Sequence, residues 1–244
     1  MSNKNILVIG ESCRDIFVYC ETKRLCPDIP VPVLNIVRQS ENPGMAKNVH
    51  RNIESKVSGC GIVTNEDWRS ITKTRYVHDT SNHTFFRVDS PHEIDRINLE
   101  DIDLNYKMII VSDYNKGFLK EEDIELICKK NKNVFLDTKK ILGSWADRAK
   151  YIKINNTEYT NSKPYLTTEL ENKIIHTTGG DGCVFQSKRF PVKKVEVKDS
   201  SGAGDSFIAG LAMNYLKTKD ISKAIKFANL CASEVVKHRG VSTI

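Results

Sequence analysis

Short apolar runs alternate with segments of helical periodicity along most of this 244-residue chain. Buried strands are predicted at residues 6–9, 108–111, 134–136, 151–154 and 174–176. Helices are predicted at residues 46–54, 121–129, 203–216 and 221–237. Strands that alternate with helices favour a mostly parallel sheet covered on both faces. The pattern therefore predicts one α/β domain over residues 1–244, with ligands beyond the carboxyl ends of the strands.

A second sequence pattern occurs at residues 15–19, 31–38, 74–77 and 83–89, where strand-like segments have no predicted helix between them. These segments predict a small separate sheet, with lid segments at about residues 13–38 and 74–90. A lid over a substrate site is the favoured interpretation. An extension of the edge of the main sheet is the alternative.

Composition argues against several classes of function. Hydrophobic residues make up 39% of the chain, and the apolar runs are too short to span a bilayer. The first residues contain no signal peptide, and seven cysteines without a Cys-x-x-Cys pair predict free thiols in a reducing cytoplasm. The net charge of +6 is dispersed among acids, which argues against nucleic acid and suits phosphorylated small molecules.

The strongest chemical signal is a glycine-rich run at residues 198–207 that opens directly into an apolar helix. Gly202 and Gly204 let the backbone approach a ligand, and the unpaired N–H groups of the first helical turn favour an anion. Asp205 would repel that anion unless it serves as a base beside a transferring phosphoryl group. No Gly-Lys-Ser/Thr follows the glycines, so this is not a Walker A loop. For the glycines alone, a plain helix N-cap is the alternative.

The run from Asp199 to Asp205 (DSSGAGD) resembles the signature of the PfkB-type, ribokinase-like sugar kinases. Further segments resemble, in family order, the D-glycero-β-D-manno-heptose 7-phosphate kinases, the kinase half of the bifunctional ADP-heptose synthesis enzymes. These segments are LCPDIPVPVL at 25–34, PGMAKNV at 43–49, SDYNKG at 112–117 and LDTK at 136–139. The resemblance covers nearly the whole chain, with contractions after Asn52 and between Glu158 and Lys173. Met45 stands where the family has a glycine, and would add bulk near the sugar.

The resemblance implies a ribokinase-like fold with a small β lid and an ATP- and Mg²⁺-dependent kinase. Its acceptor would be the anomeric hydroxyl of D-glycero-D-manno-heptose 7-phosphate. Asp205 would be the catalytic base, assisted by the N–H groups of Gly202, Ala203 and Gly204. The sugar would be bound by Asp15, Gly44, Asn48, Arg87 and Lys116. The nucleotide would be bound by Lys139, Asn155, Thr177, Gly179, Gly182 and Asn229. Glu158 and Asn155 would organise Mg²⁺, largely through water.

Plainer alternatives stay open for the individual residues. Asp15 is otherwise a turn residue, Gly44 and Asn48 mark a helix start, residues 177–182 form a hairpin turn, and Lys116 and Lys139 are solvated charges. Glu11 replaces the first Asp of the family's Gly-Asp-x-x-x-Asp. Asp199 and Ser201, with residues 240–242, resemble the monovalent-cation site of some ribokinase relatives.

Two other functions remain compatible with the sequence. One is a kinase of another sugar or sugar phosphate, such as a fructose- or ribose-like acceptor. The other is a sugar- or nucleotide-binding protein without turnover, against which the retained Asp205, Asn155 and Glu158 argue. Fold-level analogy also predicts a homodimer with the lid strands as its contact.

Overall fold

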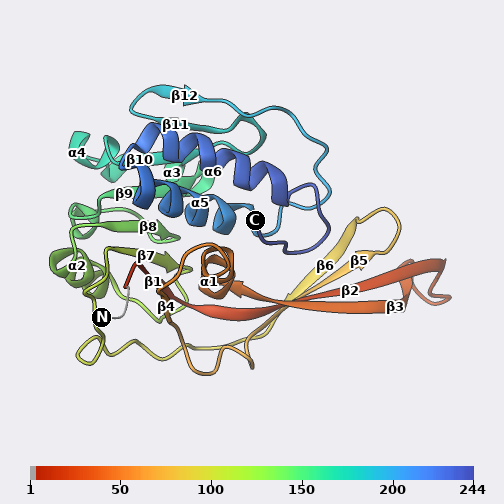
Figure 1. Ribbon diagram of the computed structural model, residues 1–244. Helices are drawn as coiled ribbons and strands as arrows, with labels where there is room; N and C mark the ends of the chain where they lie inside the picture. Colours follow the sequence, from red (N-terminus) through yellow and green to blue (C-terminus); the bar gives the residue numbers. More distant parts are fainter. Residues whose placement is uncertain (1–3) are drawn as a thin grey trace.

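The computed structural model describes residues 4–244, and its main body is built on a mixed eight-stranded sheet (Figure 1). The strand order is β12-β11-β10-β9-β8-β7-β1-β4. Neighbours from β10 to β4 run parallel, whereas β11 pairs antiparallel with both β10 and β12. The strands are β1 (Ile6–Gly10), β4 (Cys60–Val63), β7 (Met108–Asp113), β8 (Val134–Thr138), β9 (Tyr151–Asn155), β10 (Ile174–Thr177), β11 (Cys183–Phe185) and β12 (Lys188–Phe190).

Helices cover both faces of this sheet, because successive residues of a buried strand point to opposite sides. In β1, Ile6 and Val8 pack in a core with α1, α5 and α6, whereas Leu7 and Ile9 pack in a core with α2 and α4. The helices are α1 (Ala46–Glu54), α2 (Glu121–Lys130), α3 (Asn156–Ser162), α4 (Thr168–Glu171), α5 (Ala203–Thr218) and α6 (Ile221–Val235). The predicted mostly parallel α/β fold is confirmed.

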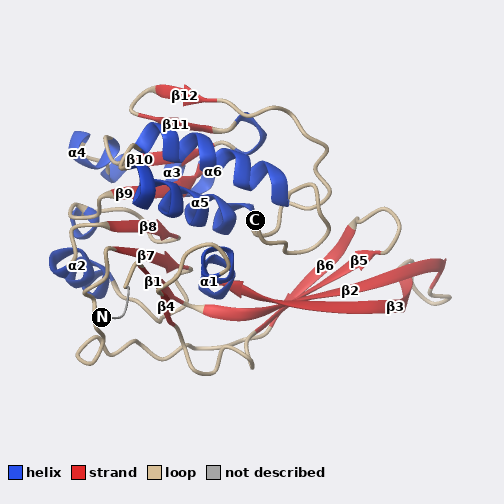
Figure 2. Ribbon diagram, viewed as in Figure 1, coloured by secondary structure: helices blue, strands red, loops and turns tan. Residues whose placement is uncertain are grey.

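Four further strands form a second sheet in the order β3-β2-β5-β6, which projects from the main body (Figure 2). They are β2 (Ser12–Leu25), β3 (Pro32–Met45), β5 (Thr72–His78) and β6 (Thr84–Asp89). Phe17, Tyr19 and Val77 of its inner face pack against Val241 near the C-terminus. The four strands are a sheet of their own and do not extend the edge of the main sheet. The action of this second sheet as a lid stays a prediction.

Several elements were not predicted from the sequence. The strand β4 is a four-residue edge strand that contains a glycine, and β11 and β12 have three residues each, so none carries a readable period. The helices α3 and α4 lie within a polar stretch. The strands β2 and β3 have 14 residues each and are much longer than predicted, because the residues that lengthen them, mainly 20–25 and 39–45, are mostly polar and lack an apolar alternation.

Among residues 4–244, no helix has both the length and the apolar character needed to cross a membrane. All seven cysteines lie in this part of the chain, and each is a free thiol. Burial raises the pKa of Cys13, Cys60, Cys128 and Cys183 to about 12, which makes these thiols poor nucleophiles. The cytoplasmic location stays a prediction.

Candidate active site

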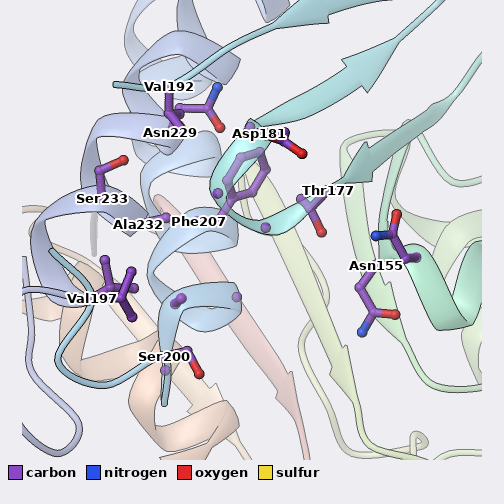
Figure 3. Close-up of a pocket in the computed structure, with 18 of the residues that line it drawn as sticks. Asn155, Thr177, Asp181, Val192, Val197, Ser200, Phe207, Asn229, Ala232 and Ser233 are labelled. Carbon is purple, nitrogen blue, oxygen red and sulfur yellow. The ribbon is translucent and has the colours of Figure 1, made fainter. Parts of the chain in front are cut away.

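A cavity of about 800 Å³ opens at the carboxyl ends of β9 and β10 and extends along the start of α5 to α6. In Figure 3, Asn155 and Thr177 lie on one side of it, and Asn229 and Ser233 of α6 lie on the other. Most residues of the predicted catalytic and nucleotide sets line this one cavity: Gly202, Ala203, Gly204, Asp205, Lys139, Asn155, Thr177, Gly179, Gly182 and Asn229. The position follows the rule that open α/β sheets bind ligands beyond their carboxyl edge.

Asp205 lies in the first turn of α5 and is 6% exposed. Two neutral groups hold its carboxylate: the Tyr114 hydroxyl donates to Oδ1 at 2.6 Å, and the Asn48 amide donates to Oδ2 at 2.8 Å. Burial raises the pKa of Asp205 to about 6, although both hydrogen bonds lower it. A carboxylate with this pKa is suited to accept a proton near neutral pH.

The turn before Asp205 requires glycine at position 202 and is closely packed at Gly204. Gly202 is the N-cap of α5 with φ of 80°, and a Cβ there would lie 2.9 Å from the Asn48 amide nitrogen. A Cβ on Gly204 would lie 2.9 Å from the Lys153 ammonium nitrogen. The glycines therefore let the turn lie directly against polar side chains of α1 and β9.

Lys153 and Tyr114 are site residues to which the sequence analysis gave no role. Lys153 is buried within β9 and forms an ion pair of 2.9 Å with the buried Asp137 of β8. It lines the cavity beside Gly204. A lysine inside a predicted buried strand was the available signal for Lys153, because buried charges are rare unless paired.

On the nucleotide side, Asn155 and Glu158 form a reciprocal cap at the start of α3. The Asn155 side-chain oxygen accepts from the Glu158 N–H at 3.0 Å. The Glu158 carboxylate accepts from the backbone and side-chain N–H groups of Asn155 at 2.7 and 2.8 Å. Lys139 forms an ion pair with the same carboxylate. Burial lowers the pKa of Lys139, but the Asp137 and Glu158 carboxylates more than offset this and raise it above its usual value.

This arrangement bears on how Mg²⁺ could be held. Both Glu158 oxygens already accept hydrogen bonds from Asn155 or Lys139. No group of three or more His, Cys, Asp or Glu side chains with metal-binding geometry occurs within residues 4–244. Because Mg²⁺ keeps several of its waters, the residues present fit an ion held through water beside phosphate oxygens.

On the sugar side, the structure brings Asp15 together with Gly44, and Asn48 together with Asp205. Asp15 forms an ion pair of 2.8 Å with Arg75 of β5. A Cβ on Gly44 would lie 2.2 Å from the Asp15 carboxylate, so β3 can lie this close to the Asp15 side chain only with glycine at position 44. Asn48 is buried in α1 and bonds to Asp205.

Arg87 and Lys116 do not join these groups. Arg87 of β6 forms a two-point contact with Asp89, at 2.7 and 3.1 Å. The exposed Lys116 donates its backbone N–H to Glu11 at 2.9 Å. None of the five predicted sugar residues, these two included, lines the cavity. A sugar contact by either residue stays a prediction.

Three further predicted positions have a structural role, and two of them, Thr177 and Asn229, also line the cavity. Thr177 pairs with Cys183, so residues 178–182 are the turn of an antiparallel hairpin, as the plainer alternative expected. The Asn229 amide donates to the Phe190 carbonyl at 2.9 Å and thereby holds β12 against α6. Asp199 accepts from the backbone N–H groups of Ser201 and Gly240 at 2.8 and 3.1 Å. A monovalent cation at Asp199 stays a prediction.

Met45 lies at the junction of β3 and α1, and its side chain is buried in the core that also contains Cys13 and Ile71. An effect of its bulk on the sugar stays a prediction. Its backbone has a φ of 60°, which glycine adopts at no steric cost.

Residues 122–244 match the model of the pfkB family carbohydrate kinases. The bifunctional protein HldE of Helicobacter pylori strain J99 is 32% identical over 296 residues, covering 97% of this chain and 64% of that protein. HldE of Campylobacter curvus is 29% identical over 297 residues, covering 98% and 62%. The chain thus spans less than two thirds of the length of these relatives.

Solved structures resemble the whole chain. Ribokinase from Thermotoga maritima superposes with a TM-score of 0.73 at 18% identity, covering 97% of this chain and 94% of that one. A phosphofructokinase-2 mutant from Escherichia coli gives a TM-score of 0.72 at 13% identity, covering 98% and 95%. These likenesses show a ribokinase-like fold. With the family match over half of its length, this chain belongs to the pfkB family of carbohydrate kinases, phosphotransferases that act on a sugar hydroxyl.

Proposed function

We propose that this sugar kinase transfers the γ-phosphoryl group of ATP to the anomeric hydroxyl of D-glycero-D-manno-heptose 7-phosphate. The observation that carries the reaction is Asp205, a buried carboxylate at the start of α5 with a pKa raised to about 6. The identity of the sugar is supported by the ordered motifs over 25–139 and by the relatives named HldE.

In the proposed reaction, Asp205 accepts the proton of the anomeric hydroxyl as its oxygen attacks the γ-phosphorus in line. The N–H groups at the start of α5 stabilise the negative charge that spreads over the transferring group. Asp15, oriented by Arg75, accepts hydrogen bonds from sugar hydroxyls. When bound through the waters around Asn155 and Glu158, Mg²⁺ supplies neutralisation of phosphate charge.

We also propose that the second sheet closes over the sugar and forms the contact of a homodimer. The second sheet and the turn between β2 and β3 carry apolar side chains that are about half exposed or more: Leu25, Ile29, Val31, Ile36, Val37, Phe86 and Val88. A contact between two copies would remove them from water. Light scattering on the eluting peak of a sizing column should give twice 27.7 kDa. A monomer at working concentration contradicts the dimer.

The experiment for the proposed function measures ADP release with D-glycero-D-manno-heptose 7-phosphate, fructose, ribose and the phosphates of the last two. Asp205→Asn serves as the blank. We expect turnover to be confined to the heptose phosphate. Turnover with another sugar would keep the family chemistry and refute the proposed substrate. A folded protein that binds ATP and turns over none of these sugars would be a binding protein.

A further inference from the structure

Tyr114 makes the shortest contact to the proposed base. Its hydroxyl donates to Asp205 Oδ1 at 2.6 Å, and its side chain lines the cavity. Burial and the Asp205 carboxylate raise the pKa of Tyr114 well above its usual value. The hydroxyl therefore keeps its proton near neutral pH and acts on Asp205 as a hydrogen-bond donor.

The backbone of Tyr114 is fixed by a buried carboxylate. Glu11, which follows β1, accepts from the backbone N–H groups of Tyr114 and Lys116 at 2.8 and 2.9 Å. Asn115, between these two residues, has a φ of 56°, and Gly117, directly after Lys116, has a φ of 106°. Glu11 thus holds a tight turn at the carboxyl end of β7. This structural role accounts for the burial of the Glu11 carboxylate, which does not line the cavity.

The ring of Tyr114 lies between the two halves of the site. The Lys73 ammonium of β5, in the second sheet, is 4.9 Å from the ring centroid. The Lys139 ammonium, which follows β8 on the nucleotide side, is 5.4 Å from the same centroid. A cation over an aromatic face is attracted to it, so both lysines favour this ring position.

We propose that Tyr114 is a positioning residue, whose hydroxyl fixes the Asp205 carboxylate and determines how readily that carboxylate takes up a proton. The contacts of its ring with Lys73 and Lys139 connect this hydrogen bond to the second sheet and to the nucleotide side of the site. The proposal rests on Asp205 being the base of the proposed function. Through the Tyr114 hydroxyl, Asp205 stays charged at lower pH than burial alone would allow.

Other groups around Asp205 stay in place when the hydroxyl is removed. Asn48 of α1 donates to Oδ2, Asp137 of β8 raises the pKa of Asp205, and Lys153 of β9 lowers it. With a phenylalanine at position 114, burial and these charges persist, whereas one hydrogen bond to the charged form is lost. The pKa of Asp205 must therefore rise.

The test compares Tyr114→Phe with Tyr159→Phe. Tyr159 also donates to a carboxylate, Glu171, at 3.0 Å, but it does not line the cavity. The Asp205 carboxyl is titrated by carbon-13 NMR without sugar, its signal being assigned by its loss in Asp205→Asn. We expect Tyr114→Phe to raise its midpoint by about one pH unit and Tyr159→Phe to leave it unchanged. An unchanged midpoint in Tyr114→Phe overturns the proposal.

The pH dependence of kcat/KM gives the second readout. The acidic limb should move to higher pH in Tyr114→Phe by the same amount as the carboxyl titration. If Tyr114→Phe does not fold, Glu11→Gln should shift the titration in the same direction by less, because its amide can accept only one of the two backbone bonds. A Glu11→Gln midpoint at the wild-type value would then overturn the proposal. If the heptose phosphate is not a substrate, the NMR titration still decides the role of Tyr114.

Discussion

Asp205 and Asp15 are the two carboxylates proposed to face the sugar, and the protein holds them in different ways. Asp205, at the start of α5, is held by two neutral donors, Tyr114 and Asn48. Asp15, in β2, is held by the guanidinium of Arg75 at 2.8 Å. Neutral donors fix a carboxylate without cancelling its charge, so it can still accept a proton. A charged partner compensates the carboxylate and fixes its orientation, which suits binding.

The comparison predicts that the same isosteric change has different kinetic effects at the two positions. Asp205→Asn should lower kcat about 10²- to 10⁴-fold, because it removes the base while it keeps the shape of the site. ATP affinity, measured by calorimetry, should stay at the wild-type value. If Asp205→Asn turns over at the wild-type rate, the assignment of the base is wrong.

Asp15→Asn should act on binding of the sugar. We expect the KM for the sugar to rise about 10- to 100-fold, since hydrogen bonds to a charged acceptor contribute about 1.5–3 kcal/mol each. The KM for ATP should not change, and kcat should fall by less than tenfold. Steady-state kinetics with each substrate varied in turn separates these effects. A kcat loss as large as that of Asp205→Asn would remove the distinction between the two carboxylates.

Asp205→Asn and Asp15→Asn should change the free energy of unfolding in opposite directions. The pKa of Asp205 is about 6 in the folded chain and near 3.8 in an unfolded one, so the folded state binds its proton more tightly. The cost of that buried charge is fully present above about pH 6 and is lost as the pH falls toward 4. Asp205→Asn should therefore increase the free energy of unfolding at pH 8 by up to about 3 kcal/mol, which is seen as a higher Tm. This gain in stability should vanish near pH 4.

Asp15→Asn should decrease the free energy of unfolding at pH 8 by about 1 kcal/mol and so lower Tm, because Arg75 loses its charged partner in a half-buried setting. Calorimetric scans of both variants and the wild type at pH 8 and pH 5 measure these shifts. A lower Tm for Asp205→Asn at pH 8 would show that the buried charge of Asp205 carries no cost.

The sequence predicted those features that depend on neighbouring residues. The helix α1 begins and ends at the predicted residues, because Pro43 and Gly44 precede a stripe of Ala46, Val49 and Ile53. The glycine-rich start of α5 was likewise readable, since Gly202, Gly204 and Asp205 are close in the chain.

The contacts that tune the site were not readable, because they depend on the order of strands in the sheet. Tyr114 and Asp205 are 91 residues apart, and Lys153 meets Asp137 only because β9 lies beside β8. The family motifs identified the segment that contains Tyr114, but no local pattern assigns its hydroxyl to a partner. The burial of the Met45 side chain was not readable for the same reason, since the core cluster that contains it is built from distant segments of the chain.

Met45 has one more consequence, which concerns the stability of the fold at this position. Its left-handed backbone costs about 1–3 kcal/mol for a residue with a Cβ, and its buried side chain contributes about 1.5–3 kcal/mol. Glycine at position 45 would remove the backbone strain, but it would also remove the stabilisation from the buried side chain. The two contributions are of similar size, so methionine is tolerated at this position of the fold without a large net cost in stability. Residue 45 therefore acts on the stability of the junction between β3 and α1 through two opposed contributions, the strain of its backbone and the burial of its side chain.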